Sequence, residues 1–294
     1  MSVITEHRIT EQPVAHPAQF APPLTMIGPV MGRGLHVMSF NIRLDRPETL
    51  PGDPDHWPER RPLLRELLAL EQPTILGVQE ALRHQLDAVA EGLGTGYDMV
   101  GYSRDADSGG EHCAIFHDAR RLDLLAWDQV WLSDTPEQIG SATWGNDVPR
   151  ILVWARFRDA VSGRDFVHIN THFDHESEPA RIKSAEAIVA LAERFAGLPV
   201  IVTGDFNADA GTSAAYTELI RPGAFADSWY ASRRLVSGDW GTFPGYEEPV
   251  AGGTRIDWIL ATPEVTVHRA GINVWTRAGR YPSDHAPVQA VMSL

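Results

Sequence analysis

Apolar and polar positions alternate in several short segments after about residue 34, and each such segment predicts a strand. In DFVHINTH (165–172), Val167 and Ile169 share one face while Asn170 and His172 share the other. The segment PVIVTGDFN (199–207) is apolar on both faces, so we expect it at the centre of a sheet. Further strands are predicted for LHVMSFN (35–41), TILGVQE (74–80), RIDWILA (255–261) and APVQAVMSL (286–294).

Two segments instead have the spacing of amphipathic helices. In SEPARIKSAEAIVALAERFA (177–196), apolar residues recur every three or four positions, Ser177 can cap the first turn and Pro179 suits it. The segment ERRPLLRELLALE (59–71) has the same spacing. Many strands, few helices and no glycine-rich phosphate loop argue against a Rossmann or P-loop protein. The pattern favours an α/β sandwich with largely buried sheets.

Length and composition are sufficient for one large core. The chain has 294 residues, of which 43% are hydrophobic. Residues 1–33 contain prolines at 13, 17, 22 and 23, which predicts an irregular arm before a single domain over 34–294. No run of about 18 apolar residues is present, so no membrane span is expected. The first residues also lack the basic start and apolar stretch of a secretory signal.

The single cysteine and the net charge exclude further classes. Cys113 alone can form neither an intramolecular disulfide nor a multi-cysteine zinc site, and we expect it to be buried and inert in a reducing, cytoplasmic setting. The formal net charge of −14 argues against a broad nucleic-acid footprint, because duplex binding depends on Lys and Arg neutralising phosphates. It leaves a local basic groove open.

Polar side chains recur where the predicted strands end. Each of them alone has an ordinary explanation, such as a turn residue, a helix cap or a hydrogen-bonded core histidine. Together they form the set Asn41, Glu80, Asn170, His172, Asp174, His175, Asp205, Asn207, Asp257, Asp284 and His285. Carboxylates gathered at one edge of a sheet repel one another, and a divalent cation removes that cost. Because the set is rich in oxygen and has no thiolate cluster, it favours Mg²⁺ or Mn²⁺; the histidines keep zinc open, without an HExxH spacing to support it.

The ordered motifs SFN, QE, NTH, GDFN, RIDWI and SDH resemble those of the endonuclease/exonuclease/phosphatase superfamily, which includes deoxyribonuclease I and inositol-polyphosphate 5-phosphatases. The resemblance covers roughly residues 34–294, and NTHFDH and GRYPSDH are most similar to a bacterial subgroup. It implies a four-layer α/β/β/α sandwich, with two mixed sheets packed face to face and helices outside. It also implies metal-dependent hydrolysis of a phosphate ester.

The resemblance further implies roles for individual residues. Glu80 would be the main metal ligand, with Asn41 beside it and Asp284 near the metal. The catalytic set would comprise Asp205, which deprotonates water, Asn207 and His285, which contact the phosphate, Asp257, which orients His285, and His172, with Glu111 as the partner of His172. On the substrate side we expect Arg150, Asn170, Asp174 and His175. Phe243 and Tyr246 lie on a glycine-rich loop before Asp257 that could border the pocket.

Three functions remain open at this point. We favour hydrolysis of a small phosphodiester or phosphomonoester, because the chain has no basic helix or lysine-rich loop that would track DNA. A nuclease acting on DNA or RNA would need Arg33, Arg60, Arg61, Arg233 and Arg234 to converge on His285. A non-catalytic binding module is disfavoured, because Glu80, Asp205, Asn207 and His285 are all present.

Overall fold

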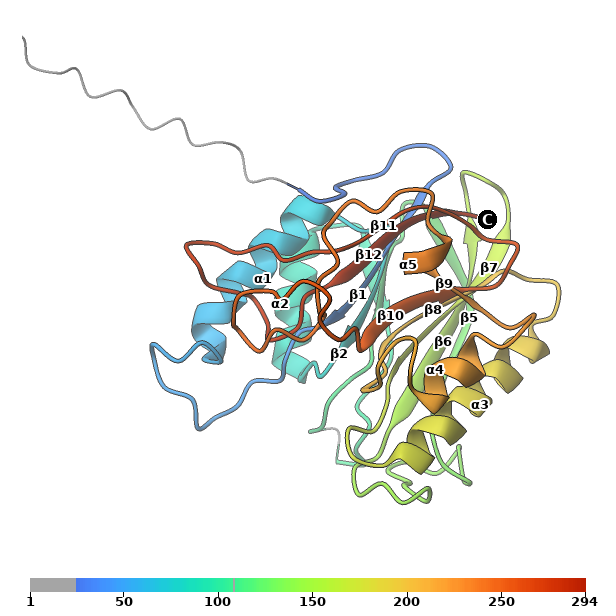
Figure 1. Cartoon of the computed structure of the whole chain (residues 1–294), viewed down its shortest axis with the longest axis horizontal. Coiled ribbons are helices and arrows are strands. Elements are labelled where there is room, and N and C mark those ends of the chain that lie inside the picture. Colours follow the sequence, from blue (N-terminus) through green and yellow to red (C-terminus); the bar gives the residue numbers. More distant parts are fainter. Residues whose placement is uncertain (1–24, 108) are drawn as a thin grey trace, which may run out of the picture.

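The computed structural model describes residues 25–107 and 109–294, and in them two mixed six-stranded sheets pack face to face with helices outside (Figure 1). This confirms the predicted four-layer α/β/β/α sandwich. The first sheet has the order β11 (Thr266–Ile272), β12 (Val288–Ser293), β1 (Leu35–Asn41), β2 (Ile75–Gln79), β4 (Ile115–Asp118) and β3 (Tyr97–Val100). The second has the order β5 (Leu122–Trp131), β6 (Ile151–Asp159), β7 (Asp165–His172), β8 (Val200–Asp205), β10 (Asp257–Ala261) and β9 (Ala226–Asp227).

Each sheet is built around one parallel pair of strands. In the first sheet β1 pairs in parallel with β2, and α1 (Trp57–Glu71) connects them. In the second sheet β7 pairs in parallel with β8, and α3 (Glu178–Arg194) connects them. The other pairings are antiparallel. Since parallel neighbours end at the same edge, each pair brings two strand ends together.

The helices cover the outer faces of both sheets (Figure 1). On the first sheet, α1 and α2 (Arg83–Leu93) bury apolar residues that include Leu64 and Leu67 against Phe40 and Val78. On the second sheet, α3 and α4 (Ala214–Leu219) pack in the same way, and the short helix α5 (Ser228–Ala231) lies near β10 and β11. Ser177 caps α3, as predicted, by accepting a hydrogen bond from the backbone of Ala180.

Strand alternation decides which side chains face the space between the sheets. In β7, Val167 and Ile169 belong to the apolar cluster under α3, so Asn170 and His172 point to the other sheet. A polar layer follows the apolar core there: Asn170 Oδ1 accepts from Gln79 Nε2 at 2.7 Å and from Thr203 Oγ1 at 3.0 Å. The sheets approach closely at this level.

Gly77 permits that approach. A Cβ added at this position would overlap the Thr203 hydroxyl and the Asn170 amide oxygen across the interface. Asn170 is fully buried, and its Nδ2 donates to the carbonyls of Val78 and Ala114. Its amide is therefore used entirely inside the sandwich.

The predicted boundary between arm and domain is too late in the chain. Glu71, at the end of α1, is buried and accepts hydrogen bonds from the backbone nitrogens of Met26, Ile27 and Gly28 at 2.7, 3.1 and 2.9 Å. Residues 26–28 are thus tied to the core by a carboxylate, and the folded unit begins before residue 34. The part of the predicted arm over 1–24 lies outside the described residues.

A search of the described residues finds no helix that combines the length and the apolar character needed to cross a bilayer.

Candidate active site

Strand ends from both sheets meet at one end of the sandwich and line a cleft of about 470 Å³. Asn41 ends β1 and Asp205 ends β8, and Asn41 Nδ2 donates to Asp205 Oδ2 at 2.9 Å across the two sheets. Asp257 begins β10, in register with Asp205 on the neighbouring antiparallel strand. These residues have the parity that points between the sheets, so local strand geometry explains their convergence.

His285 and Asp257 form a buried pair in the site. His285 Nδ1 lies 2.9 Å from Asp257 Oδ2, and both side chains are almost fully buried. The turn before β12 holds the imidazole, because Ser283 Oγ donates to the carbonyl of Asn41 at 2.7 Å and accepts from the His285 backbone. Burial alone would lower the pKa of His285, but the charges of Asp257 and Asp205 outweigh it and raise the pKa to about 10. The imidazole is therefore a cation at neutral pH.

Asp205 faces the same space with a pKa close to neutrality. Burial, and then the charge of Asp257, raise the pKa of Asp205 to about 7, while His285 and the amide of Asn41 oppose the shift. Its Oδ1 accepts from the backbone nitrogen of Asn207 at 2.9 Å. A carboxylate that titrates near the working pH is suited to general-base chemistry.

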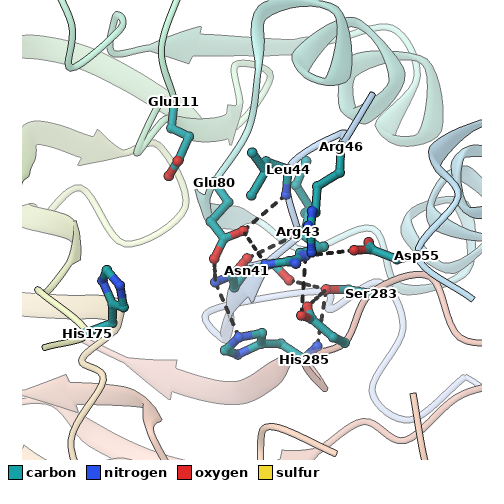
Figure 2. Close-up of polar contacts among 12 residues, drawn as sticks. Asn41, Arg43, Leu44, Arg46, Asp55, Glu80, Glu111, His175, Ser283 and His285 are labelled. Carbon is teal, nitrogen blue, oxygen red and sulfur yellow. Dashed lines mark hydrogen bonds and ion pairs between the residues drawn. The ribbon is translucent and has the colours of Figure 1, made fainter. Parts of the chain in front are cut away.

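Glu80 presents both oxygens toward the cleft edge. It follows β2 with a left-handed φ of 62°, which turns its side chain out of the strand direction. Oε1 accepts from Asn41 Nδ2 at 2.9 Å and Oε2 from the backbone of Leu44 at 3.1 Å (Figure 2). Burial would raise the pKa of Glu80, but the His285 charge and the Asn41 bond keep it lowered. The carboxylate is therefore ionised.

The donor set fits a hard divalent cation. Glu80, His172 and Asp205 offer ligand atoms within 4.8 Å of one another. Asp284 lies at the cleft as well, and burial raises the pKa of its carboxyl, which is the cost that a nearby cation would remove. Carboxylates with one amide and one imidazole suit Mg²⁺ or Mn²⁺.

A family model described as the endonuclease/exonuclease/phosphatase family matches residues 38–285. The chain belongs to the endonuclease/exonuclease/phosphatase family. This confirms the resemblance inferred from the motifs, and enzymes of this family are generally hydrolases that depend on a divalent metal ion.

Solved structures extend this result. A family protein from Bacteroides thetaiotaomicron is 32% identical and superposes with a TM-score of 0.83 over 90% of this chain and 98% of that one. A mannosyl-6-phosphatase of the same bacterium is also 32% identical, with a TM-score of 0.81 over 88% of this chain and 100% of that one.

By sequence, a protein of Acanthamoeba polyphaga mimivirus is 30% identical over 163 residues, which span 52% of this chain and 60% of the viral protein.

His172 and Asn207 form one wall of the family site. Asn207, with a φ of 46°, directs Nδ2 to His172 Nε2 and to the carbonyl of Phe173, both at 3.0 Å. Burial, and then the charge of Arg150, hold the pKa of His172 well below its usual value, so this imidazole is neutral. Within the described part of the chain, His172 Nδ1 has no hydrogen-bond partner.

Among the described residues, His172 and Glu111 share no hydrogen bond, so the predicted partnership has no contact to support it. Both terminal nitrogens of Arg104 instead donate hydrogen bonds to the Glu111 carboxylate, at 2.8 and 2.6 Å. The two residues belong to one loop, seven positions apart, so the local ion pair forms instead of a contact with His172. Glu111 still lines the cleft, and burial raises the pKa of its carboxyl against the opposing charge of Arg104.

Arg150 and His175 also line the cleft. The buried Arg150 donates from Nε to Asp174 Oδ2 at 3.3 Å, and its Nη2 lies 2.8 Å from His175 Nδ1. Figure 2 shows His175 across an open space from Glu80. Asp174 does not line the cleft; it also accepts from the backbone of residues 176 and 177, so it holds Arg150 in place from behind.

Two residues predicted to contact substrate lie elsewhere. Asn170 is fully buried in the polar layer between the sheets, so its predicted substrate role is wrong. Tyr246 turns away and donates its hydroxyl to Asp55 Oδ1 at 2.8 Å. Phe243, from the same loop, does line the cleft; its ring centroid is 4.7 Å from that of His285, and the residue is 53% exposed.

Two arginines of the site were not predicted from the sequence, and a third, Arg60, was predicted only as part of a nuclease groove. Arg43 and Arg104 line the cleft, and the fully buried Arg60 donates to the carbonyls of residues 42, 43, 44 and 282 beneath it. The only indication for Arg43 is its place two residues after Asn41 at a strand end. A single arginine there is indistinguishable from a surface charge until tertiary contacts are known.

Proposed function

We propose that the chain is a divalent-metal-dependent hydrolase of a small phosphate ester. The convergence of Asp205, Glu80 and the cationic His285 on one cleft carries this proposal. A base, an acidic metal site and a fixed positive charge are the three elements that phosphate ester hydrolysis needs. Mg²⁺ or Mn²⁺ is the proposed cofactor.

Each residue of the cluster has a proposed task. Asp205 orients a water molecule and takes its proton as the water oxygen bonds to phosphorus and the P–O bond to the leaving alcohol breaks. His285 donates a hydrogen bond from Nε2 to a phosphate oxygen and stabilises the charge that develops there, while Asp257 holds Nδ1. Glu80, with Asp205 and His172 nearby, would hold the cation, and Asn41 and Asp284 lie beside it. When bound, the cation neutralises phosphate charge and stabilises the leaving oxygen.

The cleft is also suited to an anionic substrate. Arg150 and His175 line it, together with Arg104. Asn207 is the proposed amide donor to phosphate, although its Nδ2 now contacts His172 and Phe173, so this amide must reorient as substrate binds. These groups would position the phosphate between Arg150 and His285.

Among small esters, a phosphorylated sugar is the first substrate to test. The cleft of about 470 Å³ is of a size for a small molecule, and the exposed Phe243 ring beside His285 could pack against a sugar ring. The 32% identical mannosyl-6-phosphatase adds support. The five arginines that a nuclease would need do not line the cleft: Arg60 is buried, and Arg61 pairs with Glu91.

A substrate panel tests this proposal. We would assay the purified protein with a hexose 6-phosphate, a generic phosphodiester and plasmid DNA, each with Mg²⁺, Mn²⁺ or EDTA. His84→Ala, which removes a half-exposed histidine outside the cleft, is the control variant. Hydrolysis of a small ester, abolished by EDTA and retained in the control, is the expected result. Nicking of DNA without hydrolysis of small esters would contradict the proposed substrate class.

A further inference from the structure

Arg43 places a cation inside the group of carboxylates proposed to bind metal. Its guanidinium nitrogens lie 3.2 Å from an oxygen of Asp55, 3.5 Å from one of Asp284 and 3.7 Å from one of Glu80. Figure 2 shows the side chain between Glu80 and Asp55. Three carboxylates from distant parts of the chain therefore share one guanidinium.

The position of Arg43 is built into the core. Its backbone has a left-handed φ of 56°, which is uncommon for a residue other than glycine, and Asn41 Oδ1 accepts from its nitrogen at 3.0 Å. Its carbonyl accepts from Gln85 Nε2 at 2.9 Å and from Arg60 Nη2 at 3.3 Å. Because Gln85 and Arg60 are fully buried, this turn is held by the protein interior.

The charge that Arg43 balances belongs to Glu80 and Asp284. Asp55 already has two other partners, since Arg60 Nη2 lies 3.3 Å from it and Tyr246 donates to it at 2.8 Å. Glu80 and Asp284 each have one oxygen facing Arg43. Without the guanidinium, these two largely enclosed carboxylates would repel each other with only the charge of His285 to oppose it.

Two-metal phosphoesterase sites place their ions about 3.5–4 Å apart and share carboxylates between them. Here Glu80 Oε1 faces Asn41, which also contacts Asp205, while Oε2 faces Arg43. Glu80, Asp205 and His172 offer ligand atoms within 4.8 Å of one another, so one cation can be shared among them. The guanidinium already fills the space on the other side.

We propose that Arg43 replaces a second metal ion, so that this chain binds a single divalent cation in its cleft. The inference rests on the metal dependence proposed above. It assigns Arg43 as a positioning residue that keeps Glu80 and Asp284 in place by a permanent charge, since a guanidinium does not lose its proton in proteins.

Manganese stoichiometry tests this inference without reference to turnover. We would titrate the metal-stripped, full-length protein with Mn²⁺ by calorimetry and record its electron paramagnetic resonance spectrum. Arg43→Met removes the charge at similar length, and Arg43→Lys keeps it. Arg46→Met is the control, because Arg46 is exposed in the same loop and pairs with Glu48. Thermal unfolding verifies that each variant is folded.

We expect one Mn²⁺ per chain in the wild type, in Arg43→Lys and in Arg46→Met. We expect two in Arg43→Met, with the spectrum of a spin-coupled pair. Two ions in the wild type would overturn the inference even if Arg43→Met did not fold. One ion in Arg43→Met, at unchanged or tighter affinity, would also overturn it, because Arg43 would then be irrelevant to binding or would compete with the first ion. No binding by any protein would instead contradict the metal dependence itself.

Discussion

The imidazole of His285 and the carboxylate of Asp257 meet at 2.9 Å between Nδ1 and Oδ2, with both side chains buried at one end of the two sheets. Asp257 begins β10 and His285 precedes β12, so this contact joins the second sheet to the first. Asp257 accepts from Nδ1, and because the raised pKa keeps the ring protonated at neutral pH, Nε2 also carries a proton.

Asp257→Asn should lower turnover by roughly 10²- to 10⁴-fold, the range for losing an oriented acid–base group. It should also move the alkaline limit of activity to lower pH. Asp257 is the largest contribution that raises the pKa of His285 against burial, and the cationic imidazole is lost sooner as pH rises once that charge is removed. A pH–rate profile measures both effects; an alkaline limb that stays in place would contradict the role of Asp257.

Glu80→Gln should raise the Mn²⁺ concentration needed for half-maximal activity by at least about tenfold. The substitution keeps the shape of the side chain but removes the charge that we propose as the main metal ligand. Glu111→Gln is the matched control, since Glu111 lines the same cleft and is paired with Arg104. Equal metal titrations for the two variants would exclude Glu80 as a ligand.

Removal of residues 1–33 should destabilise the protein relative to removal of residues 1–24. The longer deletion takes away the three backbone donors of the buried Glu71 and leaves it with Asn273 Nδ2. Removing hydrogen-bond donors from a buried polar group costs about 1–3 kcal/mol, and more when the group is charged. Urea unfolding of the two proteins compares them directly, and coincident midpoints would show that the anchor contributes nothing.

His168 should make stability depend on pH through its burial. Burial, and then the charge of His117, lower the pKa of His168 to about 3, below the value near 6.5 of an unfolded histidine. The unfolded chain therefore binds an extra proton between these values, and stability is lost as pH falls below about 6.5.

His168→Asn cannot take up this proton. Its free energy of unfolding should fall by about 3 kcal/mol less than that of the wild type between pH 7 and pH 4. Other groups titrate in both proteins and cancel in the difference. Urea unfolding at several pH values would measure it, and parallel curves for the two proteins would argue against a neutral, buried His168.

The strand-end residues of the site could be predicted because alternation is a local property. Asn41, His172 and Asp205 end apolar strands with the parity that faces the opposite sheet, and the fold brings them together. The predicted strand over 199–207 ends two residues earlier, at Asp205, because Asn207 adopts a left-handed φ of 46°.

Depth along a strand was not predictable from the same pattern. Asn170 has the parity of His172 but lies two residues before it, about 6.6 Å deeper in the sandwich. That distance separates the polar layer from the cleft. The strand β5 was not predicted for another reason. It lies at the edge of its sheet and has six consecutive exposed residues, so its sequence lacks the alternation of buried and exposed positions.

The contacts of the arginines were the hardest part of the site to predict. Nothing beside Arg43, Arg60 or Arg104 in the sequence indicates its partners or backbone acceptors, which are known only once the loops are folded. Glu111, for example, pairs with Arg104 of the same loop and not with His172, as the family resemblance had implied.

The central claim is that Asp205 and His285 perform metal-dependent hydrolysis in this cleft. The most direct test is the rate of hexose 6-phosphate hydrolysis by the wild type, Asp205→Asn and His285→Ala, measured side by side with Mn²⁺ and with EDTA, with circular dichroism to verify folding. We predict hydrolysis by the wild type that EDTA abolishes, and a loss of at least about 10²-fold in each variant. Near-normal rates in either folded variant would contradict the account.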